Sequence, residues 1–313
     1  ADIRSSDGTL FPQDTRNILK KAIADAQREG VSVNFGTEFE FYLFRLDAEG
    51  NATNIPYDNA KYMDIAPLDR GENVRREICL TLCEMGIRAE SSHHEDGPGQ
   101  NEIDFRYGDA LSAADNAITF PSVVRTVAMR NGLWADFSPK PLPQESGNGM
   151  HINLSLGNPR TEDARNAFMA GLMEHICEIT AFLNPVDASY ARLGEHKAPR
   201  FVTWSPENRS QLIRIPAAKG EYERLELRSP DPAGNPYLSF ALILAAGADG
   251  IRRNLAAPPA TNVNLFTADA SITGKLRQLP RTRAEAAKIA KESEFVHAVL
   301  PEGIIEAYTA ELD

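Results

Sequence analysis

Four segments of the chain alternate apolar with ionisable or polar residues, and this alternation restricts its fold more than any other feature. The segments are residues 31–44, 102–107, 151–156 and 224–228. Because successive side chains of a β-strand point to opposite faces, each segment is predicted to be a strand with one apolar face. Helical patterns lie between these segments without a regular βαβ rhythm. The sequence therefore predicts an α+β fold with a mostly antiparallel sheet.

The helices of this fold are predicted from apolar residues that recur every three or four positions. They cover residues 14–29, 72–85, 110–131, 163–182, 235–254 and 283–292. Thr282 and Glu285 have the spacing of a capping box at the start of the last helix. No repeat, low-complexity tract or linker in the sequence marks a domain boundary.

The opposite face of the four strands concentrates glutamate, histidine and arginine rather than the mixed polar residues of a solvated surface. It carries Glu38, Glu40, Glu102, His151 and Glu226. Glu95 adds another carboxylate seven residues before Glu102, across a Gly-Pro-Gly turn. Each strand taken alone could also be a half-buried strand with one solvent-exposed face. In the same way, His151 alone could be a buried histidine whose hydrogen bonds are satisfied. Taken together, the strands favour one cavity filled with ions.

The chemistry of this cavity follows from its charges. Clustered carboxylates repel one another, and their pKa values rise unless cations neutralise them. Five glutamates with one histidine suit Mg²⁺ or Mn²⁺ better than zinc. Forked donors for phosphate or carboxylate oxygens, which could equally form surface ion pairs, come from Arg192, Arg209, Arg214, Arg224 and Arg228. The residues thus predict a metal-dependent enzyme that acts on phosphate and carboxylate groups.

The overall charge argues against several other classes of protein. With 33 Lys and Arg against 44 Asp and Glu, the net charge is −11, and such a surface repels nucleic acid and anionic membranes. Three cysteines are too few for a disulfide framework. The longest apolar run, residues 238–246, is much shorter than the roughly 20 residues of a membrane span, and the polar start resembles no signal peptide. We therefore expect a cytoplasmic protein without a nucleic-acid or membrane partner.

Several segments resemble, in the same order, motifs of the glutamine synthetase catalytic domain. They include Gly36-Thr-Glu-Phe-Glu-Phe-Tyr-Leu-Phe44, Glu95-Asp-Gly-Pro-Gly-Gln-Asn-Glu102, Gly147-Asn-Gly-Met-His151, Asn208-Arg-Ser-Gln-Leu-Ile-Arg-Ile-Pro216 and Arg224-Leu-Glu-Leu-Arg-Ser-Pro-Asp231. The resemblance implies a curved, mostly antiparallel sheet whose polar inner face lines the site and which helices cover. It also implies that residues 1–313 are one catalytic domain, that the family's amino-terminal β-grasp domain is not part of this chain, and that subunits form a ring-shaped homo-oligomer.

The resemblance further implies roles for individual residues. One Mg²⁺ or Mn²⁺ ion beside the substrate carboxylate would be held by Glu40, Glu95 and Glu102, and a second ion on the ATP phosphates by Glu38, His151 and Glu226. The amino acid would be bound by Gly147, Arg192 and Arg228. The nucleotide or its phosphates would be contacted by Tyr107, Ser155, Arg209, Arg214 and Arg224, with Arg209 also acting in catalysis. ATP would phosphorylate the γ-carboxylate of glutamate, and ammonia or a small amine would then displace the phosphate.

Lys197 departs from the family's pattern, because a carboxylate that closes over the ammonium site normally precedes the Ala-Pro pair found here at 198–199. A lysine repels ammonium and cannot deprotonate it as a carboxylate can, so the amine is left open between ammonia and a small amine. A non-catalytic structural or regulatory relative would also account for Lys197, although the six retained metal ligands argue against it. A guanidino kinase, which would need a nucleophilic acceptor site, is a third alternative.

Overall fold

The computed structural model describes residues 1–218, 220 and 223–310, and ten strands of these residues form one open sheet. The strands are β1 (Ser32–Leu46), β2 (Ala52–Pro56), β3 (Ala89–His94), β4 (Gln100–Phe105), β5 (Gly108–Asp109), β6 (Leu133–Asp136), β7 (Met150–Asn158), β8 (Trp204–Pro206), β9 (Ile213–Ile215) and β10 (Leu225–Leu227). Their order is β3-β4-β1-β7-β10-β9-β8, and β2, β5 and β6 also pair with β1. Within the described chain, only the pairing of β8 with β9 is parallel.

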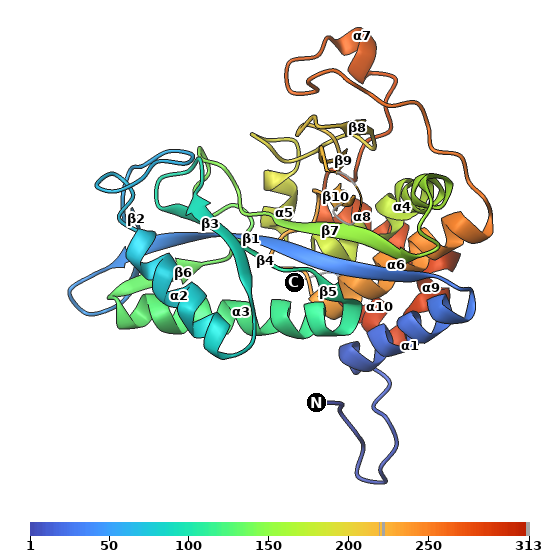
Figure 1. Ribbon diagram of the computed structural model, residues 1–313, viewed down its shortest axis with the longest axis horizontal. Coiled ribbons are helices and arrows are strands. Elements are labelled where there is room, and N and C mark those ends of the chain that lie inside the picture. Colours follow the sequence, from blue (N-terminus) through green and yellow to red (C-terminus); the bar gives the residue numbers. More distant parts are fainter. Residues whose placement is uncertain (219, 221–222, 311–313) are drawn as a thin grey trace.

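Helices cover the sheet mainly on one side. They are α1 (Thr15–Arg28), α2 (Glu72–Glu84), α3 (Ala110–Arg130), α4 (Glu162–Leu183), α5 (Asp187–Arg192), α6 (Pro236–Arg252), α7 (Ala270–Thr273), α8 (Arg283–Glu292), α9 (Glu294–Val299) and α10 (Glu302–Thr309). Several begin where a side chain accepts a hydrogen bond from a backbone N–H of the first turn, as at Asp14, Asp109, Thr161 and Thr282. Figure 1 shows α2 and α3 beneath the long strand β1, with α7 and the loops around β8 above it.

The apolar face of β1 explains this arrangement. The ring of Phe35 stacks on Phe240 of α6 with centroids 4.4 Å apart, and Phe39 lies 5.1 Å from Phe120 of α3. All four rings are buried, so the helices remove the apolar face from water. Because strand side chains alternate, the same packing turns the glutamates of β1 toward the opposite face of the sheet.

The predicted α+β fold is confirmed, and the six predicted helices begin and end within two residues of the observed ones. The strand predicted at 102–107 was misplaced, because β4 spans Gln100–Phe105 and Tyr107 lies beyond its end. The short helices α5, α7, α9 and α10 were not predicted, since four to eight residues carry too little periodicity. The last three residues of the predicted 1–313 domain lie outside the described residues. Among the described helices, none is long and apolar enough to cross a membrane.

Candidate active site

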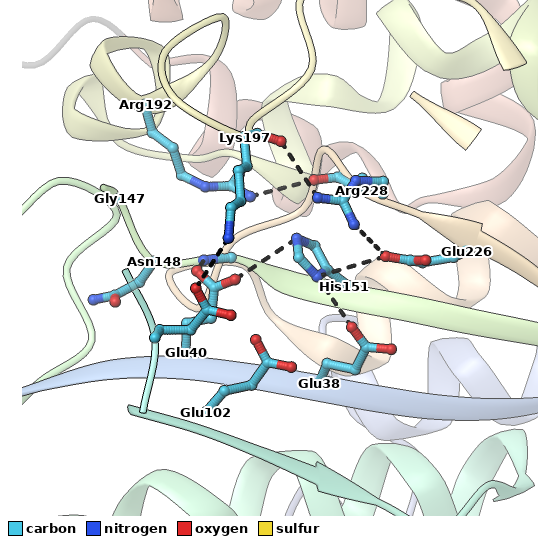
Figure 2. Close-up of polar contacts among 12 residues, drawn as sticks. Glu38, Glu40, Glu102, Gly147, Asn148, His151, Arg192, Lys197, Glu226 and Arg228 are labelled. Atoms are coloured by element: carbon cyan, nitrogen blue, oxygen red, sulfur yellow. Dashed lines mark hydrogen bonds and ion pairs between the residues drawn. The ribbon is translucent and has the colours of Figure 1, made fainter. Parts of the chain in front are cut away.

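Three neighbouring strands bring Glu38, His151 and Glu226 together on the polar face of the sheet (Figure 2). Glu38 on β1 pairs in register with His151 on β7, and β7 pairs in turn with β10, which carries Glu226. His151 Nδ1 lies 3.1 Å from Glu38 Oε2 and 3.8 Å from Glu226 Oε1. One ligand atom from each residue lies within 4.8 Å of the other two. These three residues are the set predicted to hold one divalent ion.

A second group with the same compactness consists of His93, Glu95 and Glu102. His93 on β3 stands opposite Glu102 on β4, and its Nε2 lies 3.4 Å from Glu102 Oε1. His93 Nδ1 lies 4.0 Å from Glu95 Oε1. His93 was not predicted as a ligand, and the signal that could have identified it was its position two residues before Glu95. A histidine therefore adds a nitrogen donor to the predicted second ligand set.

Glu40 lies between these two groups. Its Oε1 is 3.9 Å from His151 Nε2, and its Oε2 accepts a hydrogen bond of 2.7 Å from the backbone N–H of Gly149. Glu40 pairs in register with Glu102, yet Glu40 does not belong to the second compact group of His93, Glu95 and Glu102. The assignment of Glu40 to the same ion as Glu95 and Glu102 stays a prediction.

Asp104, on the same face of β4, was not selected from the sequence. It forms a third compact group with Glu38 and Glu102, and its Oδ1 is buried without a hydrogen-bond partner. Burial and the charge of Glu38 raise the pKa of Asp104 to about 7. The period-two pattern placed Asp104 beside Glu102 and was the signal that could have identified it.

Burial and mutual repulsion shift the pKa values of the glutamates strongly. Burial, followed by the charge of Glu40, raises the pKa of Glu95 to about 7. Burial is also the largest cause that raises the pKa of Glu102 well above its usual range. For Glu38 burial acts in the same direction, but the hydrogen bond and charge of His151 outweigh it and lower the pKa to about 2. Carboxylates that repel one another in this way suit a divalent cation, which would favour their ionised forms.

Arginines add positive charge beside these carboxylates. Arg192 is buried, and its Nη1 donates to the backbone carbonyl of Ser229 at 2.8 Å. Arg214 and Arg228 both form ion pairs with the buried carboxylate of Glu226. The side chains of Arg192, Arg228 and Glu226 are drawn together in Figure 2. The site thus combines donors for anionic oxygens with acceptors for cations.

The two remaining predicted arginines lie at the edge of this cluster. Arg224 Nε donates to Asn153 Oδ1 at 3.0 Å, and Asn153 Nδ2 donates to Glu38 Oε1 at 2.7 Å. Arg209 is exposed. Burial lowers the pKa of Arg209, but the neighbouring Tyr62 has the opposite effect and outweighs it. The charges of Glu226 and Glu95 also raise this pKa, so the net shift is upward. Arg209 is therefore an accessible cation within electrostatic reach of the carboxylates.

Tyr107 lies in the short connection between β4 and β5, and Ser155 lies on β7. A Cβ atom added to Gly36 would lie 3.4 Å from Tyr107 Cβ and 3.7 Å from Asn153 Cβ, so Tyr107 stands beside β1 and β7. Ser155 follows Asn153 by two residues and shares its face of β7. Their predicted contacts with the nucleotide stay predictions.

The segment of residues 147–149, which leads into β7, borders one side of the site. A Cβ on Gly147 would lie only 2.4 Å from the carbonyl oxygen of Pro139 and 2.8 Å from Arg192 Cγ, so glycine is required here. The amide of Asn148 is fully buried, and Gln100 Nε2 donates to its Oδ1 at 3.2 Å. Asn148 and Gln100 were not predicted, because uncharged amides give no charge pattern. Their contacts hold residues 147–149 against β4.

Two of the predicted ligands, Glu40 and Glu95, line a small cavity of about 20 Å³. Gly147, Arg192 and Lys197 are also among the residues that line it. Both Glu195 and Lys197 border this cavity. Burial lowers the pKa of Lys197, but its ion pair with Asp96 outweighs burial and raises it. The predicted substitution thus places a lysine side chain at the site itself.

Known proteins are similar to this chain over nearly its whole length. The family described as the glutamine synthetase catalytic domain matches residues 12–311. Glutamine synthetases of Clostridium saccharobutylicum and Methanosarcina mazei are 44% and 45% identical over 99% and 98% of the chain, which corresponds to 73% and 72% of those proteins. A solved structure titled GmaS/ADP complex superposes with a TM-score of 0.87 at 32% identity and covers 99% of this chain and 74% of that one. The cryo-EM structure of Plasmodium falciparum glutamine synthetase, at 23% identity, shares the fold with a TM-score of 0.84 over 98% of this chain and 77% of that one.

Proposed function

The chain belongs to the glutamine synthetase family as a catalytic domain, and from this premise we propose how its residues carry out the reaction. It is an ATP-dependent ligase that forms glutamine. A carboxylate is a poor electrophile until one of its oxygens becomes part of a phosphate leaving group. The site must therefore bring the γ-carboxylate of glutamate and the terminal phosphate of ATP together and neutralise their combined negative charge.

Two divalent ions, Mg²⁺ or Mn²⁺, fit the donor atoms of this site. Two compact groups of oxygen and nitrogen donors support the positions of these two ions in the site. We assign one ion to Glu38, His151 and Glu226, and the other to Glu95 and Glu102 with Glu40 and His93 as further donors. Such ions would supply Lewis-acid stabilisation of anionic oxygens. Carboxylates whose repulsion raises their pKa would be ionised beside such cations.

The arginines complete the charge balance. Arg209 is the accessible guanidinium near Glu95 and Glu226, and we assign to it the stabilisation of the phosphoryl group during transfer. Arg192 lines the cavity beside Gly147, and its Nη2 donates to the backbone carbonyl of Arg228 at 3.2 Å. We assign Arg192 and Arg228, with Gly147, to the amino acid. The remaining predicted contacts to ATP would come from Tyr107, Ser155, Arg214 and Arg224.

The amine that gives glutamine is ammonia, and a small amine, which would give a substituted amide, is the alternative that Lys197 leaves open. The proposed subunit arrangement is a ring-shaped homo-oligomer, as the resemblance of the chain implies. Ammonia requires no space beyond a cavity of about 20 Å³, whereas glutamate requires the cavity to open.

The test is phosphate release by the purified full-length protein with ATP, Mg²⁺ or Mn²⁺, glutamate and ammonium or a panel of small amines. Arg209→Ala should lower kcat at least about 100-fold and change the KM for glutamate less than about threefold, because the charge acts on the transferred group. Arg130→Ala, at the exposed end of α3, is the control and should retain full activity. Absence of phosphate release with every amine would refute the proposed function, and an active Arg209→Ala variant would refute the role of Arg209.

A further inference from the structure

Asp58 and His94 form a buried pair next to the predicted metal ligand Glu95. The side chains of His94 and Asp58 are 0% and 2% exposed, and His94 Nε2 lies 2.9 Å from Asp58 Oδ1. The other ring nitrogen of His94, Nδ1, lies 2.6 Å from the backbone carbonyl oxygen of Glu95. Neither Asp58 nor His94 belongs to a compact group of possible metal ligands in the described chain. The pair therefore reaches the site through the backbone of a ligand rather than through a ligand atom.

The hydrogen bonds of this pair determine its charge. The Asp58 carboxyl accepts from three backbone N–H groups, at 3.3, 3.0 and 3.1 Å, which belong to Ala60, Arg70 and Gly99. Hydrogen bonds from N–H groups favour the ionised form of a carboxyl. A carbonyl oxygen and an ionised carboxylate only accept hydrogen bonds, so both ring nitrogens of His94 donate and the ring is positively charged. Each buried charge has the other as its partner, and removal of one leaves the other uncompensated.

The backbone of Glu95 is fixed on both sides by the turn between β3 and β4. The N–H of Glu95 donates to the carbonyl of Gln100 at 2.8 Å, and the carbonyl of Glu95 accepts from the ring of His94. Gly99, in the same turn, has a φ of +69°, the left-handed conformation that favours glycine. Its N–H donates to Asp58, so the pair holds both the ligand and the turn that follows it. These contacts fix the direction in which the Glu95 side chain leaves the backbone.

We propose that Asp58 and His94 are positioning residues for the divalent ion assigned to Glu95 and Glu102. They hold the Glu95 carboxylate where the ion binds, without contacting the ion themselves. The side-chain hydrogen bonds described for the pair go to residues 60, 70, 95 and 99, whereas the ligands of the other ion lie on β1, β7 and β10. The affinity for that other ion should therefore not depend on the pair. The proposal rests on the proposed function and adds two residues that determine one of its two metal affinities.

A buried histidine with two partners could also serve only the stability of the fold, and the chain contains a matched case. The ring nitrogens of His175, also a buried residue, lie 2.7 Å from Glu178 Oε2 and 2.9 Å from Asp249 Oδ2. His175 joins α4 to α6, and in the described chain none of these three residues belongs to a compact ligand group. Replacing His175 therefore removes a similar pair without affecting the backbone of a metal ligand.

The test is Mn²⁺ binding to the full-length protein, measured by calorimetry. His94→Gln keeps an amide within reach of Asp58 but lacks a donor beside the Glu95 carbonyl, so the affinity of one Mn²⁺ site should fall at least about tenfold. Asp58→Ala, which leaves the ring without its carboxylate, should have the same effect and tests the pair if His94→Gln does not fold. The weakened site should be the one that Glu102→Gln also weakens, and the other site should change less than about twofold.

A conservative substitution and the matched histidine separate positioning from stability. His94→Asn places an amide donor near the position of Nδ1, so it should bind Mn²⁺ about fivefold more tightly than His94→Gln, which corresponds to about one hydrogen bond. His175→Gln should change both Mn²⁺ affinities less than about twofold, even where thermal unfolding shows a similar loss of stability.

Three results would overturn the proposal. They are an unchanged Mn²⁺ affinity in both His94→Gln and Asp58→Ala, an equal loss at both Mn²⁺ sites, and a similar loss of affinity in His175→Gln. In the phosphate assay, the Mn²⁺ concentration that gives half the maximal rate should rise at least about tenfold in His94→Gln. If no protein releases phosphate, the proposed function falls, and calorimetry still decides the role of the pair.

Discussion

Replacing Glu95 by glutamine should make the metal-free protein more stable at alkaline pH. Burial and the charge of Glu40 raise the pKa of this carboxyl from its ordinary 4.5 to about 7 in the folded protein. Between these values the folded state binds more protons than the unfolded state, so stability is present at low pH and is lost as the pH rises through 7. At about 1.4 kcal/mol per pKa unit, the ionised Glu95 costs about 3 kcal/mol by about pH 8. Glutamine has no charge to bury and avoids this cost.

The measurement is thermal unfolding of wild type and Glu95→Gln at about pH 5 and about pH 8 in a chelator. The two proteins should unfold together at the lower pH, whereas the variant should gain about 5 °C at the higher pH for a chain of 313 residues. Comparing the variant with wild type at each pH cancels the titration of the other groups. Exposed Glu49→Gln is the control and should show no such difference. Added Mn²⁺ should stabilise wild type more than Glu95→Gln, because the variant has lost a ligand.

Two results would contradict this prediction. Glu95→Gln could be less stable than wild type at about pH 8 in the chelator, or the difference between the two proteins could be the same at both pH values. Either result would mean that the Glu95 carboxylate is not destabilised by its surroundings.

Two further predictions concern packing around the site. Asp69→Asn removes the carboxylate that lies 2.6 Å from the buried guanidinium of Arg75. The free energy of unfolding, measured with urea, should therefore fall by about 3–5 kcal/mol. A decrease below about 1 kcal/mol would contradict this prediction. Gly149→Ala places a Cβ 2.6 Å from Arg192 Nη2 and 2.8 Å from His151 Nε2, so Mn²⁺ affinity measured by calorimetry should fall at least about tenfold. Gly108→Ala, where a Cβ meets nothing within 4 Å, is its control, and equal affinities in the two variants would contradict the second prediction.

Much of the fold was predictable because it depends on local patterns. The alternation along β1 identified both its core face, with Phe35 and Phe39, and its ionic face, with Glu38. Helix limits followed from periodicity and from capping residues such as Thr282, whose hydroxyl accepts from the N–H of Glu285. Each of these features is a property of neighbours in sequence, which is why it could be read without the tertiary structure.

The second histidine shows where this kind of prediction stops. His93 and His94 are adjacent, and the sequence does not say which of them faces the carboxylates. The register of β3 against β4 shifts between Ala89 and Ser91 and turns His93 toward Glu102. His94 points to the interior, where its Nε2 lies 2.9 Å from Asp58 Oδ1. A shift of one residue would exchange the two roles, and only pairing between strands determines it.

The sequence alone predicted the α+β class, the carboxylate-rich face and a metal-dependent chemistry. These predictions were possible because the alternation of side chains along a strand and the charge of each residue can be read from short segments. It also identified Lys197 as a departure and predicted its repulsion of ammonium. Only the tertiary structure placed that lysine between Asp96, Glu95 and Tyr62, since these residues come from loops far apart in the chain. Their proximity depends on strand register and on loop closure over the sheet, and neither is encoded in any single segment.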